Sequence, residues 1–297
     1  MISGVLPVMK EQGYTSSDVV VKLRGMLHVK KIGHTGTLDP DATGVLPICI
    51  GKATKIASEL TDTDKAYRCV MRLGVTTDTE DMTGEVLSTS DCEGITGTQV
   101  REAITSFIGE YDQIPPMYSA KKINGKKLYE LAREGIEIER KPSRINIISI
   151  SNINVDISGD IKRAEFSVEC SKGTYIRSLC RDIGAKLGCG AAMESLVRIK
   201  ACGIDIDKCL TLSEIEKIVP EGGDLGGNII PIDRFFMKYP PIRVMGRDEK
   251  LVRSGNKFRC EGKAPGRYRV YLRDLTFAAL YDVNKKGEAR LCRLFLG

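Results

Sequence analysis

The stretch GHTGTLDPDATG, residues 33–44, is the part of this sequence around which the remainder can be organised. Its glycines permit backbone angles and close approaches that a side chain would block. They bracket Asp39, and Pro40 after it biases Asp39 toward extended backbone. One interpretation is a shaped loop that presents a functional acid. The alternative is an ordinary Asp-Pro turn, because Asp, Pro, Gly and Thr are the usual residues of turns.

The composition is typical of a soluble globular protein. The chain has 297 residues, of which 42% are hydrophobic and 28% are charged. This length allows one large domain or two smaller ones. No apolar run approaches the roughly 18 residues of a membrane span, and the start, MISGVLPVMK, lacks the basic and apolar segments of a secretory signal. We therefore expect a cytoplasmic protein that has no membrane partner.

The cysteines and histidines do not form the pattern of a metal or redox site. Ten cysteines occur without a CxxC pair, and His28 and His34 are the only histidines. This argues against a zinc site and against a redox dithiol, so we expect reduced and mostly buried cysteines. The sequence around Lys52 contains glycines, but their spacing and the Ala53 that follows the lysine exclude a phosphate-binding P-loop.

The positive charge is concentrated near the end of the chain. The net charge is +6. Residues 238–297 contain 15 Lys and Arg against six Asp and Glu, a balance of +9, whereas the remaining residues contain 30 basic and 33 acidic side chains, a balance of −3. This division favours a basic module that meets a polyanion, attached to a nearly neutral body. A solvated basic surface without a partner is the alternative.

Hydrophobic periodicity predicts alternating strands and helices in the first 237 residues. We expect strands at 4–10, 65–74, 145–155 and 162–170, and helices after Thr15, over 98–108, around 128–134, over 176–187 and after Thr211. From about residue 238 the pattern changes to short strands separated by glycines, which predicts a small β-barrel. The sequence thus predicts two modules.

In the strand 65–74, Tyr67 lies on the apolar face, which by itself favours a core aromatic. Another segment carries residues that suit contact with nucleic acid. Between Tyr118 and Tyr129 stand four lysines, namely Lys121, Lys122, Lys126 and Lys127. Basic residues interleaved with aromatics favour contact with phosphates and stacked bases.

Four blocks of this sequence together resemble the bacterial TruB family of tRNA pseudouridine synthases. They are GHTGTLDPDATG, then KAYRCVMRLGVTTDTEDMTGE from residue 65, PPMYSAKK from residue 115 and KGTYIRSLCRDIG from residue 172. They stand in the family's order and cover most of the chain. The resemblance implies an α/β (α+β) pseudouridine synthase fold for residues 1–237, with a mixed, largely antiparallel sheet flanked by helices. For residues 238–297 it implies a small PUA-like β-barrel that binds RNA.

The resemblance also implies roles for individual residues. Asp39 is then the catalytic acid, Arg177 is its ionic partner, and Tyr67 is the aromatic ring beside the reacting base. The residues implied to bind substrate are His34, Asp81, Leu196, Lys10, Lys121 and Tyr118. The sequence departs from the family before the first helix, where Asp-Lys-Pro-x-Gly is usual and Met9-Lys10-Glu11-Gln12-Gly13 stands here.

The implied reaction is the isomerisation of uridine to pseudouridine at position 55 in the T-loop of tRNA, so the implied partner is the T arm. Because this reaction involves no redox change, we expect no metal and no cofactor, and the resemblance implies no obligatory protein partner. Two alternatives are an RNA-binding or RNA-folding module without essential catalysis, and a relative that modifies ribosomal RNA within a guided particle. The set of Asp39, Tyr67 and Arg177 disfavours the first, and the sequence of the Asp39 loop disfavours the second.

Overall fold

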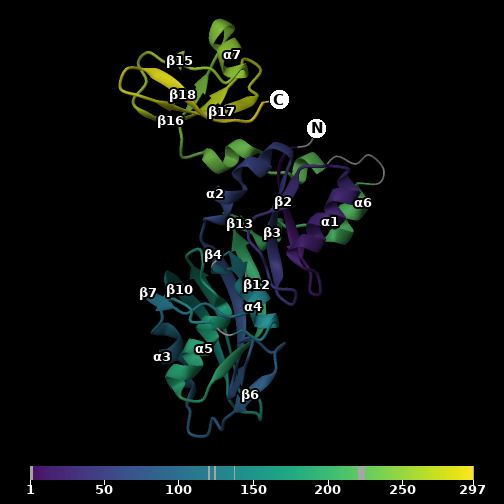
Figure 1. The fold of residues 1–297 in the computed structure, drawn as a ribbon, viewed down its shortest axis with the longest axis vertical. Helices are drawn as coiled ribbons and strands as arrows, with labels where there is room; N and C mark the ends of the chain where they lie inside the picture. Colours follow the sequence, from purple (N-terminus) through teal and green to yellow (C-terminus); the bar gives the residue numbers. More distant parts are fainter. Residues whose placement is uncertain (1–2, 120, 124, 137, 220–224, 297) are drawn as a thin grey trace.

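The computed structural model describes residues 3–296 except 120, 124, 137 and 220–224, and it shows one large sheet and one small sheet (Figure 1). The large sheet has the path β1 (Gly4–Lys10), β3 (Thr43–Ile50), β12 (Ala191–Ala201), β4 (Lys65–Leu73), β11 (Arg163–Cys170), β10 (Ser143–Asp156) and β7 (Gly109–Gln113). Beside this path, β2 (Ile32–His34) pairs with β3, and β13 (Ile204–Asp205) pairs with β12. The β3–β12 pair is parallel and the other neighbours are antiparallel. The predicted mixed, largely antiparallel sheet is therefore confirmed.

Helices cover the sheet at both ends, as predicted. In Figure 1, α1 (Ser16–Leu27) and α6 (Leu212–Ile218) lie at the β1 end, and α3 (Gly97–Thr105) and α5 (Ile176–Leu187) lie at the β7 end. Thr15 and Thr211 cap α1 and α6 with reciprocal side-chain bonds, as their sequence pattern predicts. The connecting elements are η1 (Gly51–Ile56), α2 (Ala57–Thr61), β5 (Val75–Thr77), β6 (Val86–Thr89), η2 (Ile206–Lys208), η3 (Leu225–Asn228) and η4 (Ile232–Phe236).

Strand β3 is buried on both faces and divides two hydrophobic cores. Leu46, Ile48 and Ile50 pack with α1 and α6. Val45 and Cys49 point to the opposite side, because successive side chains of a strand alternate between faces, and they pack with α2, η4 and the C-terminal sheet. The strand that leaves the Asp39 loop is thus held rigidly from both sides.

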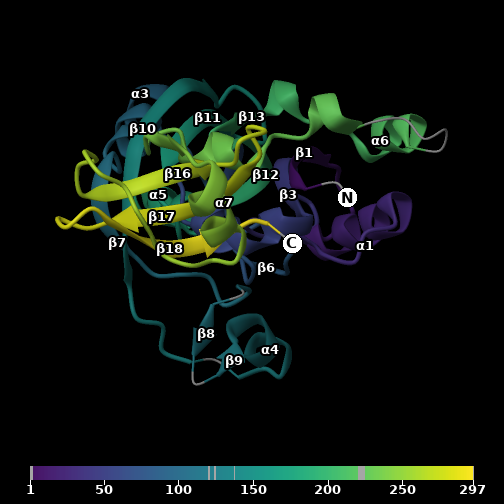
Figure 2. The same cartoon turned by 90° about the horizontal axis from the view of Figure 1, so that it is seen from above.

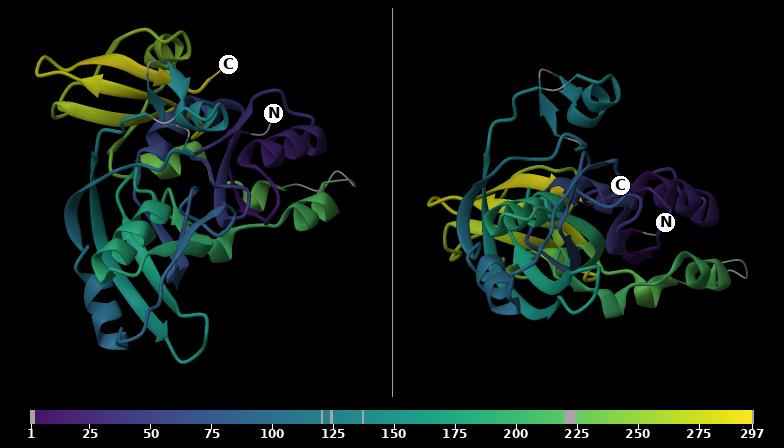
Figure 3. Two further views of the ribbon diagram at one scale, coloured as in Figure 1. Left: turned by 60° about the horizontal axis from the view of Figure 1, so that its bottom comes forward. Right: turned by 90° about the horizontal axis from the view of Figure 1, so that it is seen from below.

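A hairpin and a short helix extend from the body between β7 and β10. They are β8 (Lys122–Ile123), β9 (Lys126–Lys127) and α4 (Leu128–Arg133), and Figures 2 and 3 show them projecting away from the sheet. This projection contains the lysine-rich segment that was predicted to contact phosphates.

The C-terminal region forms a curled five-stranded sheet. Its order is β14 (Pro241–Arg243), β16 (Gly266–Tyr271), β17 (Phe277–Val283), β18 (Glu288–Leu294) and β15 (Phe258–Arg259). It has its own hydrophobic core, and its shape agrees with the predicted PUA-like barrel. Helix α7 (Gly246–Arg253) was not predicted; acidic residues occupy its first turn and basic residues its last. The domain boundary at residue 238 stays a prediction.

All ten cysteines are free, and eight of them are buried, as expected. None of the described helices is both long enough and apolar enough to cross a membrane.

Two glycines on helices predict opposite effects of the same substitution. A Cβ atom on Gly184 of α5 would lie 2.1 Å from the backbone nitrogen of Ala191, whereas one on Gly25 of α1 would meet nothing within 4 Å. We expect Gly184→Ala to lower the free energy of unfolding by about 2–3 kcal/mol through overpacking. Gly25→Ala should raise it by about 0.5–1 kcal/mol, because alanine favours the helix. Urea denaturation of both variants measures these changes, and a stabilised Gly184→Ala protein would contradict the close packing of α5 on β12.

Candidate active site

The Asp39 loop connects β2 to β3 and forms part of the wall of a hollow of about 1190 Å³. The carbonyl of Asp39 accepts a hydrogen bond from the Ala42 nitrogen at 3.1 Å, so residues 39–42 form a turn with Pro40 in its second position. The two interpretations of this sequence are therefore compatible. The turn is real, and it presents the Asp39 carboxylate to the hollow.

Three charged side chains meet at this hollow. The Arg177 guanidinium lies 3.1 Å (Nε to Oδ2) and 3.4 Å (Nη2 to Oδ1) from the carboxylate of Asp39. Its Nε also lies 3.7 Å from Oδ2 of Asp81. Arg177 is only 7% exposed, whereas the Asp39 side chain is 41% exposed. One buried cation is thus shared between two carboxylates, of which Asp39 is the one open to the hollow.

Burial and charge act in opposite directions on Asp39. Burial of the carboxyl raises its pKa above the ordinary value, the Arg177 guanidinium lowers it, and the neighbouring Asp81 raises it again. The net direction is upward. Arg177 therefore offsets part of the cost of placing a carboxylate in this site.

The position of Arg177 is fixed by backbone acceptors from two other segments. Its Nη1 donates to the carbonyl of Thr79 at 3.1 Å, and its Nη2 donates to the carbonyl of Tyr118 at 2.8 Å. The residue lies in the first turn of α5, as predicted. Because the guanidinium is planar, these acceptors fix its orientation toward Asp39 as well as its position.

The segment that carries Asp81 is held to helix α5 by side-chain contacts. Oδ1 of Asp81 accepts from the hydroxyls of Thr79 and Thr83 at 2.7 and 2.6 Å, which leaves Oδ2 toward Arg177. The adjacent Glu80 accepts from the Ser178 hydroxyl at 2.6 Å and pairs with Arg181, and both partners are on α5. Helix α5 therefore positions the cation and the second carboxylate together.

Tyr67 lies on β4 and also lines the hollow. It is 8% exposed, and burial raises the pKa of its hydroxyl, so the phenol is neutral. The other residues on its face, Cys69, Met71 and Leu73, are buried as the alternation predicted. The ring of Tyr67 thus combines core packing with one edge at the hollow.

Arg198 is the largest fully buried side chain described in the structure, although residues 196–198 alone indicated only a strand and the resemblance only the end of the family site. Its Nε donates to the Val45 carbonyl at 2.7 Å, and its two terminal nitrogens donate to the carbonyls of Thr37 and Gly36 at 3.4 and 3.3 Å. It also lowers the pKa of Tyr67, against the stronger effect of burial. Arg198 therefore holds the Asp39 loop, and it lies opposite Tyr67 in the β12–β4 register.

Lys10, at the end of β1, also binds the backbone of the Asp39 loop. Its side chain is fully buried, and its Nζ donates to the carbonyls of Ala42 at 2.6 Å, Pro40 at 2.8 Å and Glu11 at 3.1 Å. Burial lowers the pKa of Lys10 to about 8. The structure therefore gives Lys10 a contact with the loop backbone, and the RNA contact implied by the resemblance stays a prediction.

The other predicted substrate-binding residues lie at different depths. Leu196, Tyr118 and Lys121 line the hollow, and Lys121 donates to the Ser143 hydroxyl at 2.6 Å. His34 stands at the end of β2, where its Nδ1 is buried without a hydrogen-bond partner among the described atoms, and burial lowers its pKa. The side chains of Lys122, Lys127 and Tyr129 lie outside the described part of the chain.

Two further polar side chains support the site and were missed from the sequence. The hydroxyl of Ser16 accepts from the Leu38 nitrogen at 2.9 Å, directly before Asp39. Lys65 lines the hollow and donates to the carbonyls of Thr61 and Thr63 at 2.7 and 2.6 Å. Ser16 carried a local signal as the first residue of a capped helix, but its contact with the loop spans 22 residues and has no pattern in the sequence.

Across the described residues, no group of three or more metal-ligating side chains is found.

Comparison with known proteins shows which family this chain resembles. Residues 24–176 match the family described as TruB family pseudouridylate synthase (N terminal domain), and residues 177–236 match the tRNA pseudouridylate synthase B C-terminal domain. A tRNA pseudouridine synthase B of Clostridium perfringens is 42% identical over 292 residues, which are 96% of this chain and 97% of the relative. One from Streptococcus thermophilus is 44% identical over 266 residues, which are 89% of this chain and 90% of the relative.

Solved structures show the same fold at lower identity. An H/ACA RNP bound to a substrate RNA containing 2'-deoxyuridine includes a chain that matches with a TM-score of 0.69 and 21% identity, over 99% of this chain and 85% of that one. A Cbf5-Nop10-Gar1 complex gives the same TM-score at 22% identity. These matches support the fold, including its C-terminal sheet.

The charges around Asp39 predict a graded response of its pKa. We expect the pKa of its carboxyl to lie above the ordinary value for aspartate and to fall in an Asp81→Asn variant, because a neighbouring negative charge is removed. Asp41→Asn should lower it less, because Asp41 is exposed and contributes less. Titration of ¹³C-labelled aspartate carboxyls by NMR measures all three values. An unchanged or raised pKa in Asp81→Asn would contradict the shared-cation arrangement.

Proposed function

The chain belongs to the TruB family of tRNA pseudouridine synthases and isomerises uridine to pseudouridine in tRNA, and we propose that its target is the uridine at position 55 of the T-loop. In this proposal the T arm enters the hollow beside Asp39. The protein acts alone in the cytoplasm and needs no cofactor. The proposal is supported by the high identity to tRNA enzymes over nearly the whole chain.

The Asp39–Arg177 pair is the observation that carries the catalytic part of the proposal. The reaction breaks the bond between uracil N1 and C1' of the ribose, turns the base and forms a bond from C5 to C1'. N1 gains a proton and C5 loses one. A single carboxylate can start this either by adding to the base or by attacking the ribose. Both routes need an ionised Asp39, and the 3.1 Å contact with Arg177 supports that state.

The walls of the hollow suit a base that has left its stack. A target base inside a folded RNA must be extruded before an active site can reach it. We propose that the extruded uracil lies against the ring of Tyr67, with Leu196 on the other side and Asp81 near the nucleotide. His34 would occupy the space that the base leaves in the RNA, and its lowered pKa favours the neutral imidazole.

The alternatives are less well supported. An RNA-binding module would not require a carboxylate and a guanidinium held by at least four directed contacts at one hollow. A guided-particle enzyme for ribosomal RNA is disfavoured, because the matching H/ACA chains are only 21–22% identical, compared with 42–45% for the tRNA enzymes.

Replacement of the catalytic acid gives the decisive test. With tRNA tritiated at uracil C5, we expect the native protein to release tritium and Asp39→Asn to release it at least about 10³-fold more slowly, while still binding tRNA. Asp41→Asn is the matched control on the same loop and should remain active, because its side chain is exposed. Absence of release by folded native protein would leave RNA binding as the better account. Normal release by Asp39→Asn would remove Asp39 from the chemistry.

The position of Lys121 predicts a salt-dependent contribution to binding. Phosphate contacts release counter-ions, so the affinity for tRNA should fall linearly on a log–log plot against salt. If Lys121 binds one phosphate, Lys121→Ala should reduce the magnitude of the slope by about 0.7–0.9. Lys217→Ala, on the exposed face of α6, is the matched control and should leave the slope unchanged. Equal slopes for native protein and Lys121→Ala would exclude this phosphate contact.

A further inference from the structure

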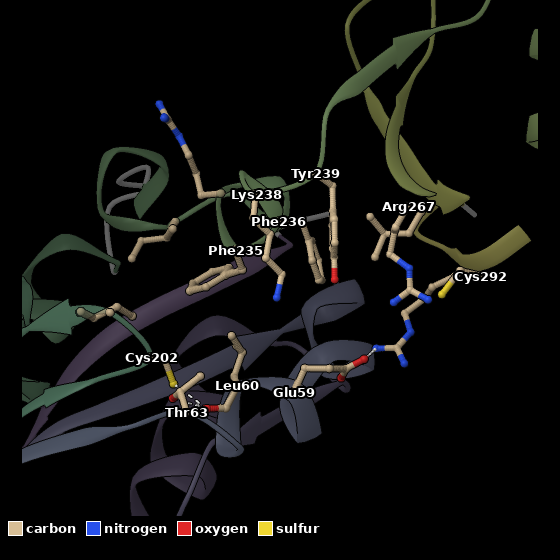
Figure 4. Close-up of a pocket in the computed structure, with 16 residues that line it drawn as sticks. Glu59, Leu60, Thr63, Cys202, Phe235, Phe236, Lys238, Tyr239, Arg267 and Cys292 are labelled. Atoms are coloured by element: carbon tan, nitrogen blue, oxygen red, sulfur yellow. Dashed lines mark hydrogen bonds and ion pairs between the residues drawn. The ribbon is translucent and has the colours of Figure 1, made fainter. Parts of the chain in front are cut away.

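A second hollow lies between the large sheet and the C-terminal sheet. It has a volume of about 590 Å³ and is bounded by the end of α2, the β12–β13 turn, η4 and the strands β16 to β18 (Figure 4). This is within the size range of small-ligand sites in proteins. None of the residues implied by the family resemblance lines it.

The charges at this interdomain hollow suit an anion. Four cations line it, namely Arg234, Lys238, Arg267 and Arg293, and its acidic side chain is Glu59. Glu59 is already paired with Arg293, and Arg267 is paired with Asp282 at 2.8 Å. Within the described part of the chain, no carboxylate pairs with Lys238 or Arg234. The hollow therefore has an excess of positive charge that its own acids do not neutralise.

The aromatic residues of the same hollow suit a planar base. Tyr239 lies between two cations, with Nζ of Lys238 at 5.2 Å and the guanidinium carbon of Arg267 at 5.7 Å from its ring centre. Phe235 is half-buried and also lines the hollow, as Figure 4 shows. Aromatic rings and arginine planes in a positively charged groove are the usual means of holding an unstacked nucleotide.

The two hollows share one wall. Leu60 and Thr63 line the interdomain hollow, whereas Thr61, Asp62 and Lys65 of the same turn line the Asp39 hollow. This turn is held from both sides, by Lys65 on the carbonyls of Thr61 and Thr63 and by the Cys202 thiol on the carbonyl of Leu60 at 3.2 Å. One RNA molecule can therefore reach both hollows across a single fixed turn.

We propose that the interdomain hollow binds one unpaired nucleotide of the same tRNA, outside the T-arm hairpin, with its base against Phe235 and Tyr239 and its phosphate near Lys238. This inference rests on the proposed function, because it takes tRNA as the substrate. It adds a second RNA site that discriminates a whole tRNA from its isolated T arm.

The test compares full-length tRNA with a T-arm hairpin. Lys238→Glu should weaken binding of tRNA by at least about threefold and leave binding of the hairpin unchanged, because only the longer RNA reaches this hollow. Lys217→Glu on α6 is the matched charge reversal and should change neither affinity. Equal loss on both RNAs would indicate a general effect of charge and would overturn the proposal, as would no loss on tRNA.

Photocrosslinking gives an independent readout on the native protein. Irradiation of the tRNA complex should attach RNA to the peptide that contains Phe235 and Tyr239, and the hairpin complex should give no such adduct. Adducts confined to peptides of the Asp39 hollow would overturn the proposal. Binding of uridine monophosphate in the interdomain hollow that tRNA fails to displace would also overturn it. Tritium release by native protein is measured in parallel, so a failure of this inference is distinguishable from a failure of the proposed isomerase function.

Discussion

Two buried cations hold the backbone of the Asp39 loop, and the geometry of the site depends on them. Strands β1 and β12 lie on either side of β3, and in the register of the sheet both Lys10 and Arg198 pair with Gly44. From these positions their side chains reach the loop and donate to its carbonyls. Irregular backbone at the edge of a core leaves carbonyls that need partners. The cations supply those partners, and the carbonyl dipoles in turn stabilise two charges that would be costly to bury alone.

The same register explains why residue 44 is a glycine. Its φ is +110°, and a Cβ atom there would lie 2.2 Å from the carbonyl oxygen of Arg198. The parallel β3–β12 pair can form only because this close approach is open, and the pair begins at Thr43 and Gly44. A larger residue would separate Arg198 from the loop that it holds. Gly44 therefore supports the site by allowing β3 and β12 to pair closely, and not by shaping the turn at Asp39.

The sequence was sufficient to predict much of the fold, but not how the site is held together. Periodicity and capping patterns predicted α1, α5, β4 and β11, because these signals are local. The family resemblance predicted that Arg177 pairs with Asp39, although 138 positions separate the two residues in the sequence. The role of Arg198 could not be predicted, since its bond to Val45 spans 153 positions and an arginine within a strand usually indicates an exposed face. The interdomain hollow could not be predicted from sequence patterns either, because its lining residues come from segments that are far apart in the sequence.

Arg177 reduces a conflict between reactivity and ionisation at Asp39. A carboxylate in a water-poor site is more reactive, but burial raises its pKa and so favours the protonated, inactive form. Here Arg177 opposes that rise, whereas the neighbouring Asp81 carboxylate adds to it. Asp39 also keeps the greater exposure of the two acids. Asp81 is fixed by threonine hydroxyls, so the shared cation leaves the proposed catalytic acid, Asp39, as the more accessible of the two carboxylates.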